Sequence, residues 1–260
     1  MSFSYEELAE IRHYIHQHPE LSGQEYQTTA FLKERLEELG IRILESRLKT
    51  GLIAEIGSGQ PVVALRADID ALPILEQTNL PYQSQNPGVM HACGHDFHQT
   101  SLLGAAALLK EKEDQLEGTV RLIFQPAEEI SEGASDVLAT GLLEDVQGII
   151  GFHNIPQLKA GQLALNAGAM MAGVEKFKVT VTGVSSHAAR PDLGVDTVTA
   201  VTTMVQNVQL LISRTVSPFE TAVLSITHLD VGSTWNVLPK SGYFEGTIRS
   251  FNPSVQRDLK

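Results

Sequence analysis

The sequence predicts an α/β domain over residues 1–172 and a smaller α+β domain over residues 173–260. In the first part, helix-like segments alternate with short, continuous apolar strands, which is the pattern of a sheet buried between helices. After the small, flexible segment from Gly168 to Gly173, strand patterns surround one long helix, as in an antiparallel sheet with helices on one face.

The composition is that of a globular protein with a substantial core, because 42% of the 260 residues are hydrophobic and 19% are charged. A net charge of -12 repels phosphate backbones and anionic lipids, so we expect small ligands and neither nucleic-acid nor membrane partners. The single cysteine cannot form an internal disulfide, and the N-terminal residues lack a basic-then-apolar export pattern. These features predict a cytoplasmic location.

Two helices are predicted near the N-terminus. Ser4-Tyr5-Glu6-Glu7 matches a capping box and begins a helix that ends before His18-Pro19. A second helix is predicted from Glu25 to Leu39, before Gly40, because glycine is common just past helix ends.

Apolar strands then lead to polar side chains. Residues 52–56 and 61–65 are predicted to form two adjacent strands, and further strands are predicted over 119–124 and 148–152. Because the carboxyl ends of strands in open α/β sheets gather ligand groups, the side chains that follow these strands predict one shared site. These side chains are Asp68, Asp70, Glu128, Glu129 and His153.

The segment from Met90 to His98 contains the only cysteine among three histidines and an aspartate. Thiolate, imidazole and carboxylate groups suit zinc, manganese, nickel or cobalt, and Gly94 lets the backbone fold around one ion. A helix predicted over 97–109 follows this loop. By itself the segment fits a metal site and a buried free thiol equally well.

The second domain is predicted to begin with an alternating strand over 177–181. Asp196 is expected to cap a helix that reaches Leu211 or Ile212, followed by strands over 221–227 and 242–248. Residues 253–260 look like the opening of a helix without an end, so we expect the chain to stop within this domain.

Five segments, taken in this order, resemble the M20 metallopeptidase/amidohydrolase family, and the cysteine points to its N-acyl-amino-acid amidohydrolase branch. That branch includes hippurate hydrolases, auxin-conjugate hydrolases and N-acetyl-diaminopimelate deacetylases. The resemblance implies a zinc-peptidase-like catalytic domain with a mixed sheet flanked by helices, and a lid and dimerisation domain. The segments are Arg66 to Pro73, His91 to Asp96, Gln125 to Glu129, Gly151 to His153 and Ser186 to Ala189.

The resemblance implies a pair of divalent metal ions, which could be manganese, zinc, nickel or cobalt, and a glutamate base, Glu128, that acts on water activated by them. Asp70 is expected to orient a ligand or to tune this base. The implied ligands are Cys93, His95, Glu129 and His153. The roles of Asp68, His91 and His98 stay open.

In the second domain, the resemblance implies that His187 reaches the active site of a partner subunit and stabilises the oxyanion there. Asn236 and Arg249 match positions that bind the substrate carboxylate, for which a planar guanidinium is well suited. A homodimer formed through residues 173–260 is therefore expected.

The implied reaction is hydrolysis of the amide bond of an N-acyl amino acid. Family chains continue beyond the position of residue 260 and supply a further histidine to the metal site, so the chain is expected to be C-terminally truncated. Two alternatives stay open: an inactive binding or regulatory protein on the same scaffold, and an aminopeptidase that acts on dipeptides.

Overall fold

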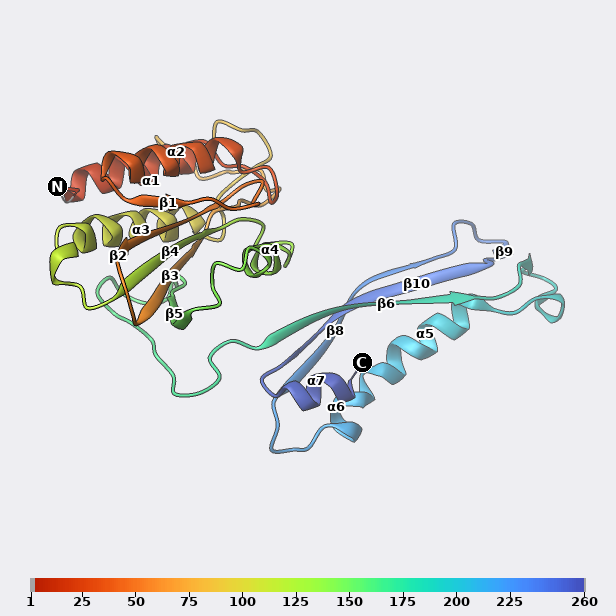
Figure 1. Cartoon of the computed structure of the whole chain (residues 1–260). Helices are drawn as coiled ribbons and strands as arrows, with labels where there is room; N and C mark the ends of the chain where they lie inside the picture. Colours follow the sequence, from red (N-terminus) through yellow and green to blue (C-terminus); the bar gives the residue numbers. More distant parts are fainter. Residues whose placement is uncertain (1–2, 260) are drawn as a thin grey trace. The chain divides into compact units, whose positions relative to one another are not determined.

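The computed structural model describes residues 3–259 (Figure 1). Contacts divide the chain into two compact units, with the division between Lys159 and Ala160. The predicted boundary after residue 172 coincides instead with the start of strand β6 (Gly173–Thr182). The small residues near this position mark where regular structure resumes, whereas the division by contacts assigns residues 160–172 to the second unit.

The first unit is built on a five-stranded sheet with the order β1-β2-β4-β3-β5. Strand β3 is parallel to β4 and β5, whereas β2 is antiparallel to β1 and β4, so the sheet is mixed as expected. The strands are β1 (Arg42–Leu44), β2 (Leu52–Gly57), β3 (Val62–Asp68), β4 (Thr119–Gln125) and β5 (Val146–Gly151).

The prediction that β2 and β3 are adjacent in the sheet is wrong, because β4 lies between them. β4 buries every residue except Val120 and pairs along both edges, antiparallel to β2 and parallel to β3. A strand with this apolar character is most stable at the centre of a sheet, where both of its faces are covered. Strand β1 was not predicted at all.

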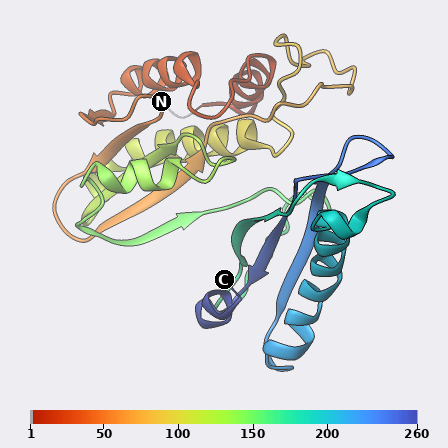
Figure 2. The same cartoon turned by 90° about the vertical axis from the view of Figure 1, so that its right-hand side faces the viewer.

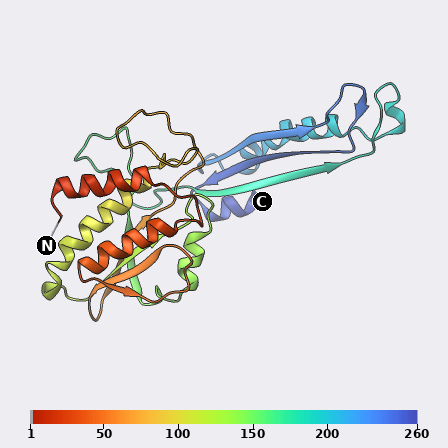
Figure 3. The ribbon, with the colours of Figure 1, turned by 90° about the horizontal axis from the view of Figure 1, so that it is seen from above.

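Helices cover both faces of this sheet. α1 (Tyr5–Gln17), α2 (Tyr26–Glu38) and α3 (His95–Lys110) pack on one face, and α3 contacts both of the others (Figure 3). The unpredicted helix α4 (Gly133–Ala139) packs on the other face through Val137, beside Ile53 and Ile123. A short 3-10 helix, η1 (Glu113–Gln115), precedes β4.

The predicted helix ends are largely correct. Ser4 and Glu7 form the expected capping box of α1. Gly40, with φ of 67°, ends α2, and its amide donates to the carbonyl of Glu37. Helix α3 begins at His95 rather than at Phe97, because Gly94, with φ of 88°, turns the chain directly into its first turn.

The second unit has a three-stranded antiparallel sheet with the order β6-β10-β8. β8 (Ala222–Val231) and β10 (Ser241–Ser250) are both longer than predicted. Helices α5 (Thr197–Val208), α6 (Leu210–Thr215) and α7 (Pro253–Asp258) cover one face, and α5 runs along the sheet in Figure 2. This arrangement confirms the predicted α+β class.

Smaller elements complete the second unit. β7 (Ser186–His187) pairs with β9 (Val237–Leu238), and a 3-10 turn, η2 (Pro191–Leu193), follows β7. Asp196 caps α5 as predicted, but the single expected helix is divided at Gln209. Helix α7 (Pro253–Asp258) lies where the opening of a helix was predicted. None of the helices within residues 3–259 combines the length and apolar character needed to cross a bilayer.

Candidate metal centre

The carboxyl ends of β3, β4 and β5 lie at one edge of the first sheet. Asp68 is the register partner of Gln125, and Arg66 is the partner of Gly151. The chain continues from these ends to Asp70, to the adjacent Glu128 and Glu129, and to His153. The parallel pairing therefore brings together the polar residues that the sequence placed after separate strands.

Possible metal-ligating atoms converge at this edge. The Sγ atom of Cys93 lies 3.3 Å from Nε2 of His153, and Nε2 of His95 lies 3.7 Å from Oε1 of Glu129. Three groups have ligand atoms that all lie within 4.8 Å of one another, and His95 belongs to each. The groups are Cys93, His95 and His153; His95, Glu128 and Glu129; and Asp68, His95 and His98.

The environment of His95 fits a metal ion. Its Nδ1 atom lies 2.9 Å from the carbonyl oxygen of Asp70 and donates a hydrogen bond to it, so in the neutral ring Nε2 carries the free lone pair. Within residues 3–259, neither this buried Nε2 nor the buried Oε1 of Glu129 has a hydrogen-bond partner. An unsatisfied buried polar atom costs about 1–3 kcal/mol, and a divalent cation would satisfy both.

Asp70 holds two of the predicted ligands. Its Oδ2 accepts hydrogen bonds from Ser22 Oγ at 2.7 Å and from the Glu129 amide at 2.9 Å, and its Oδ1 lies 3.2 Å from His95 Nδ1. Burial alone would raise the pKa of Asp70, but the hydrogen bonds from His95, Ser22 and Glu129 lower it below its ordinary value. Asp70 is therefore an ionised anchor for both His95 and Glu129.

The thiol of Cys93 is placed among carboxylates. Burial, followed by the negative charge of Glu129, raises the pKa of Cys93 to about 12. A divalent cation at the same place would reverse this balance, because a positive charge favours the thiolate. The surroundings of Cys93 are thus consistent with a bound metal ion, and without one they disfavour the thiolate form.

The turn that carries Glu128 is held by a hydrogen bond to a residue far away in the sequence. Ala127 has a left-handed φ of 50°, and its amide donates to Oε1 of Glu25 at 2.8 Å. Glu25 is fully buried, and its Oε2 accepts a hydrogen bond from Thr50. Sequence reasoning took Glu25 for the first residue of a helix, so this support of the turn was missed.

Glu128 is suited to proton transfer. Its side chain is 41% exposed and lies beside Glu129. Burial raises the pKa of Glu128, and the negative charges of Glu129 and Asp68 raise it further. A carboxylate with a raised pKa is a stronger base than an ordinary glutamate.

Asp68 and His98 form a buried pair beside the ligands. Asp68 Oδ1 lies 2.6 Å from His98 Nδ1, and its Oδ2 accepts a hydrogen bond from Arg66 at 2.7 Å. Burial alone would raise the pKa of Asp68, but the hydrogen bond from His98 and the charges of His95 and Arg66 lower it to about 2. The other ring nitrogen of His98 contacts Asn154, which the sequence reasoning overlooked although it directly follows His153.

His91 is buried, and within the described part of the chain neither ring nitrogen has a hydrogen-bond partner. Burial lowers the pKa of His91 to about 4, so the ring is neutral at pH 7. Nearby, His16 bridges two carboxylates, with Nδ1 2.9 Å from Asp96 and Nε2 3.2 Å from Glu76. This bridge from α1 to Asp96 in α3 and to Glu76 in the loop before α3 was not predicted.

The predicted residues of the second unit are partly brought together. His187 in β7 pairs with Val237, and the amide of Ala188 donates to the carbonyl of Asn236, so the loops of His187 and Asn236 are neighbours. Arg249 is not brought to these loops. It is exposed near the last residue of β10, whereas Asn236 precedes the first, and it pairs in register with Val174 and Val223.

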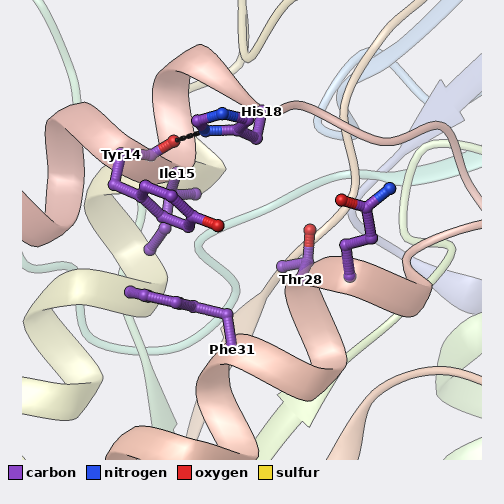
Figure 4. A pocket seen from close by; sticks show the side chains of 6 residues that line it. Tyr14, Ile15, His18, Thr28 and Phe31 are labelled. Atoms are coloured by element: carbon purple, nitrogen blue, oxygen red, sulfur yellow. Dashed lines mark hydrogen bonds between the residues drawn. The ribbon is translucent and has the colours of Figure 1, made fainter.

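A crevice between α1 and α2 is separate from these residues. Tyr14, Ile15, His18, Thr28 and Phe31 line it, and His18 Nδ1 donates to the carbonyl of Tyr14 (Figure 4). The crevice has room for about one water molecule, which excludes it as a substrate site.

Comparison with known proteins finds deacetylases and amidohydrolases among the relatives of the chain. The chain is 48% identical over 256 residues to the N-acetyl-L-cysteine deacetylase of Bacillus subtilis (strain 168), covering 98% of this chain and 62% of that protein. It is 39% identical to the N-acyl-L-amino acid amidohydrolase of Geobacillus stearothermophilus, covering 95% of this chain and 68% of that protein. These names match the predicted branch.

Among solved structures, the YXEP protein of Bacillus subtilis, a dinuclear metal binding peptidase from the M20 family, superposes with a TM-score of 0.82 at 44% identity. The superposition covers 97% of this chain and 66% of that one, and the chain spans between 54% and 68% of the length of its curated relatives. Residues 64–238 match the pattern of peptidase family M20/M25/M40. The predicted resemblance is thus confirmed, and the chain belongs to peptidase family M20/M25/M40.

Proposed function

We propose that the chain carries the metal centre of an amidohydrolase that cleaves the amide bond of N-acyl amino acids. The observation that carries this proposal is the pair of buried, unsatisfied atoms, His95 Nε2 and Glu129 Oε1, 3.7 Å apart beside Cys93 and His153. The names of the relatives from Bacillus subtilis and Geobacillus stearothermophilus support the substrate class.

The residues have distinct tasks in this proposal. Cys93, His95, Glu129 and His153 would hold two divalent ions, which supply Lewis acidity and make a water molecule more acidic. Glu128 takes the proton of the attacking water and passes it to the leaving amine when the carbon–nitrogen bond breaks. Asp70 keeps His95 and Glu129 oriented through its hydrogen bonds.

The second unit supplies substrate contacts. His187, from a partner subunit, steadies the developing oxyanion. Asn236 and Arg249 lie near opposite ends of β10, so they bind the substrate carboxylate from different subunits. This assignment requires a homodimer formed through residues 173–260. Sedimentation of the purified chain tests it, and a monomer at every concentration would contradict it. A cytoplasmic location, predicted from the single cysteine, stays a prediction.

Hydrolysis tests the reaction directly. We expect purified protein with manganese to release free amino acid from N-acetyl, N-benzoyl or indole-acyl amino acids. Glu128→Gln should lower the rate by about 10²–10⁴-fold, as loss of a general base does, without loss of metal. Glu132→Gln is the matched control, because Glu132 is exposed in the same turn and makes no side-chain cap contact. An unchanged rate in Glu128→Gln would contradict the mechanism.

Other outcomes identify the alternatives. Tight binding of N-acyl amino acids without hydrolysis would support a binding or regulatory protein on this scaffold. Faster cleavage of unblocked dipeptides than of acylated amino acids would support an aminopeptidase. Anomalous scattering across metal absorption edges would distinguish manganese, zinc, nickel and cobalt at the same ligands.

A further inference from the structure

His98 connects the two loops that carry the proposed ligands. It lies one helical turn after His95 in α3 and is 1% exposed. The Nδ1 atom of His98 is 2.6 Å from Oδ1 of Asp68. Its Nε2 atom is 3.0 Å from the backbone nitrogen of Asn154 and 2.6 Å from the side-chain oxygen Oδ1 of Asn154. The ring thus ties the end of β3 to the loop after β5.

Asn154 contacts both ligand loops. Its carbonyl oxygen accepts a hydrogen bond from Nδ1 of His153 at 2.8 Å, which leaves Nε2 of His153 facing Cys93. Its side chain also covers the turn at Gly94, where a Cβ atom would lie 2.3 Å from the amide oxygen. The position of Asn154 therefore sets both the tautomer of His153 and its distance from the turn between Cys93 and His95.

The hydrogen bonds of His98 leave no lone pair for a metal ion. One oxygen of Asp68 accepts a hydrogen bond from Arg66 and the other lies 2.6 Å from Nδ1 of His98, so Asp68 acts as a carboxylate acceptor and Nδ1 of His98 donates to it. Nε2 lies 3.0 Å from the backbone nitrogen of Asn154 and 2.6 Å from Oδ1 of its side chain, so whether Nε2 accepts from the N–H or donates to Oδ1, it directs no free lone pair at a metal ion. Thus His98 is engaged at both nitrogens, although Asp68, His95 and His98 lie close enough together to be considered as a ligand group.

We propose that His98 and Asn154 form a clamp that fixes His153, with Nδ1 protonated, against the turn of Cys93 and His95. In this assignment His98 is a positioning residue and not a metal ligand. The inference rests on the proposed metal site for its effect on metal binding, but not for its effect on the tautomer of His153.

Two substitutions of His98 separate its two hydrogen bonds. The amide of an asparagine lies near the position of Nδ1, so His98→Asn keeps the contact with Asp68 and loses the contact with Asn154. The longer glutamine reaches the position of Nε2, so His98→Gln keeps the contact with Asn154. A third variant, Asn154→Ala, removes the side-chain contact from a half-buried loop and leaves the buried helix intact.

The first measurement is made on metal-free protein. Nitrogen-15 chemical shifts of the imidazole rings report which nitrogen of His153 carries the proton. We expect one tautomer, protonated at Nδ1, in the native chain, in His98→Gln and in Asn154→Ala, which keeps the backbone N–H and carbonyl of residue 154, and a mixture of tautomers in His98→Asn. The same single tautomer in all four proteins would overturn the clamp.

The second measurement is zinc affinity, determined by competition with a chelator. We expect His98→Asn to bind zinc about 10–100-fold more weakly at unchanged stoichiometry, as loss of a residue that orients a ligand does. The zinc affinity of His98→Gln should stay within about threefold of that of the native chain, a much smaller change than in His98→Asn. A reduced number of zinc ions in both variants would identify His98 as a ligand and overturn the assignment. Absence of zinc binding by the native chain would refute the proposed function, while the tautomer result still decides the clamp.

Discussion

Asp70 sets the geometry of two proposed ligands with a single carboxylate. It faces His95 through one oxygen and accepts the amide of Glu129 through the other, and it is 1% exposed. Because the same group holds a side chain from α3 and a backbone amide from the turn after β4, a change at Asp70 disturbs both halves of the site together.

Asp70→Asn should weaken metal binding more than it weakens folding. The amide oxygen of asparagine can accept from Ser22 and Glu129, but its NH₂ group then faces Nδ1 of His95, which also donates, and the substitution removes the negative charge beside His95. We expect zinc affinity to fall about 10–100-fold and the free energy of unfolding to fall by about 1–3 kcal/mol. Asp192→Asn, at an exposed surface pair with Arg190, is the control and should change neither quantity. Equal zinc affinity in both variants would contradict this role.

The bridge formed by His16 predicts a pH-dependent stability. The hydrogen bond with Asp96 raises the pKa of His16 above 6.5, so its stabilising contribution is complete below pH 6.5 and is lost as the pH rises through the raised value. Burial alone would raise the pKa of Asp96, but the hydrogen bond with His16 helps lower it to about 2, so its contribution is lost only in strong acid. The contributions of His16 and Asp96 to the free energy of unfolding are therefore both complete between about pH 4 and 6.5.

Urea unfolding of the native chain and His16→Gln at several pH values tests this bridge. We expect the variant to be less stable by about 1.5–3 kcal/mol at pH 5, because hydrogen bonds to charged groups contribute that much. The difference should shrink at pH 9. A difference that stays constant between these pH values would show that His16 contributes by packing alone.

At the scale of single residues, the sequence identified the side chains with metal-binding chemistry but not their supports. Cys93, His95 and Glu128 stand out because their types and neighbours are unusual. Glu25 and Asn154 resemble ordinary helix-end and loop residues, and their roles depend on partners far away in the chain. Only the folded structure shows these long-range hydrogen bonds.

Helix α4 is packed unusually closely against the turn that carries Glu128. Gly133 is its first residue, and a Cβ atom there would lie 1.6 Å from the carbonyl oxygen of Pro126. The amide of Gly133 also donates to the carbonyl of Ala127. The helix therefore supports the turn from the face of the sheet opposite α1, α2 and α3.

Gly133→Ala should destabilise the first unit, because the added methyl group meets backbone rather than a movable side chain. We expect a loss of at least about 1–3 kcal/mol in the free energy of unfolding, measured by thermal or urea denaturation. Gly148→Ala is the matched control, because a Cβ atom there meets nothing within 4 Å, and it should change stability by less than about 0.5 kcal/mol. Similar effects of the two substitutions would contradict the packing argument.

At the scale of elements, the long helices and apolar strands were predictable, and the short elements were not. β1 has 3 residues and β7 has 2, too few for a periodic pattern. Helix α4 has a weak helical sequence, with glycine and aspartate in its first turns, and it is stabilised by packing. The position of β4 between β2 and β3 depends on pairing between distant segments, which local patterns do not encode.

The two units are joined by an irregular stretch. Between the end of β5 and the start of β6 there is no helix or strand, and Leu163 and Leu165 are more than four-fifths exposed. The sequence predicted two domains from composition, and the fold class of each is confirmed. It did not predict that compact packing would divide at residue 159, since contacts between distant residues decide such a division.

Limited trypsin digestion should first cleave after Lys159. Exposed, irregular backbone is cut faster than strands and helices, because the protease must bind an extended segment. We expect two fragments, residues 1–159 and 160–260, identified by mass spectrometry. First cleavage at Lys176 or Lys178 within β6 would contradict this assignment.

The hydrogen bond from Ala127 to Glu25 joins residues 102 positions apart. During synthesis at about 5–20 residues per second, Glu25 is added to the chain roughly 5–20 s before Ala127. Until then its carboxylate is hydrated, and the N-terminal end of α2 cannot reach its final burial. The turn that presents Glu128 therefore forms late on the ribosome, after most of the first sheet has been made.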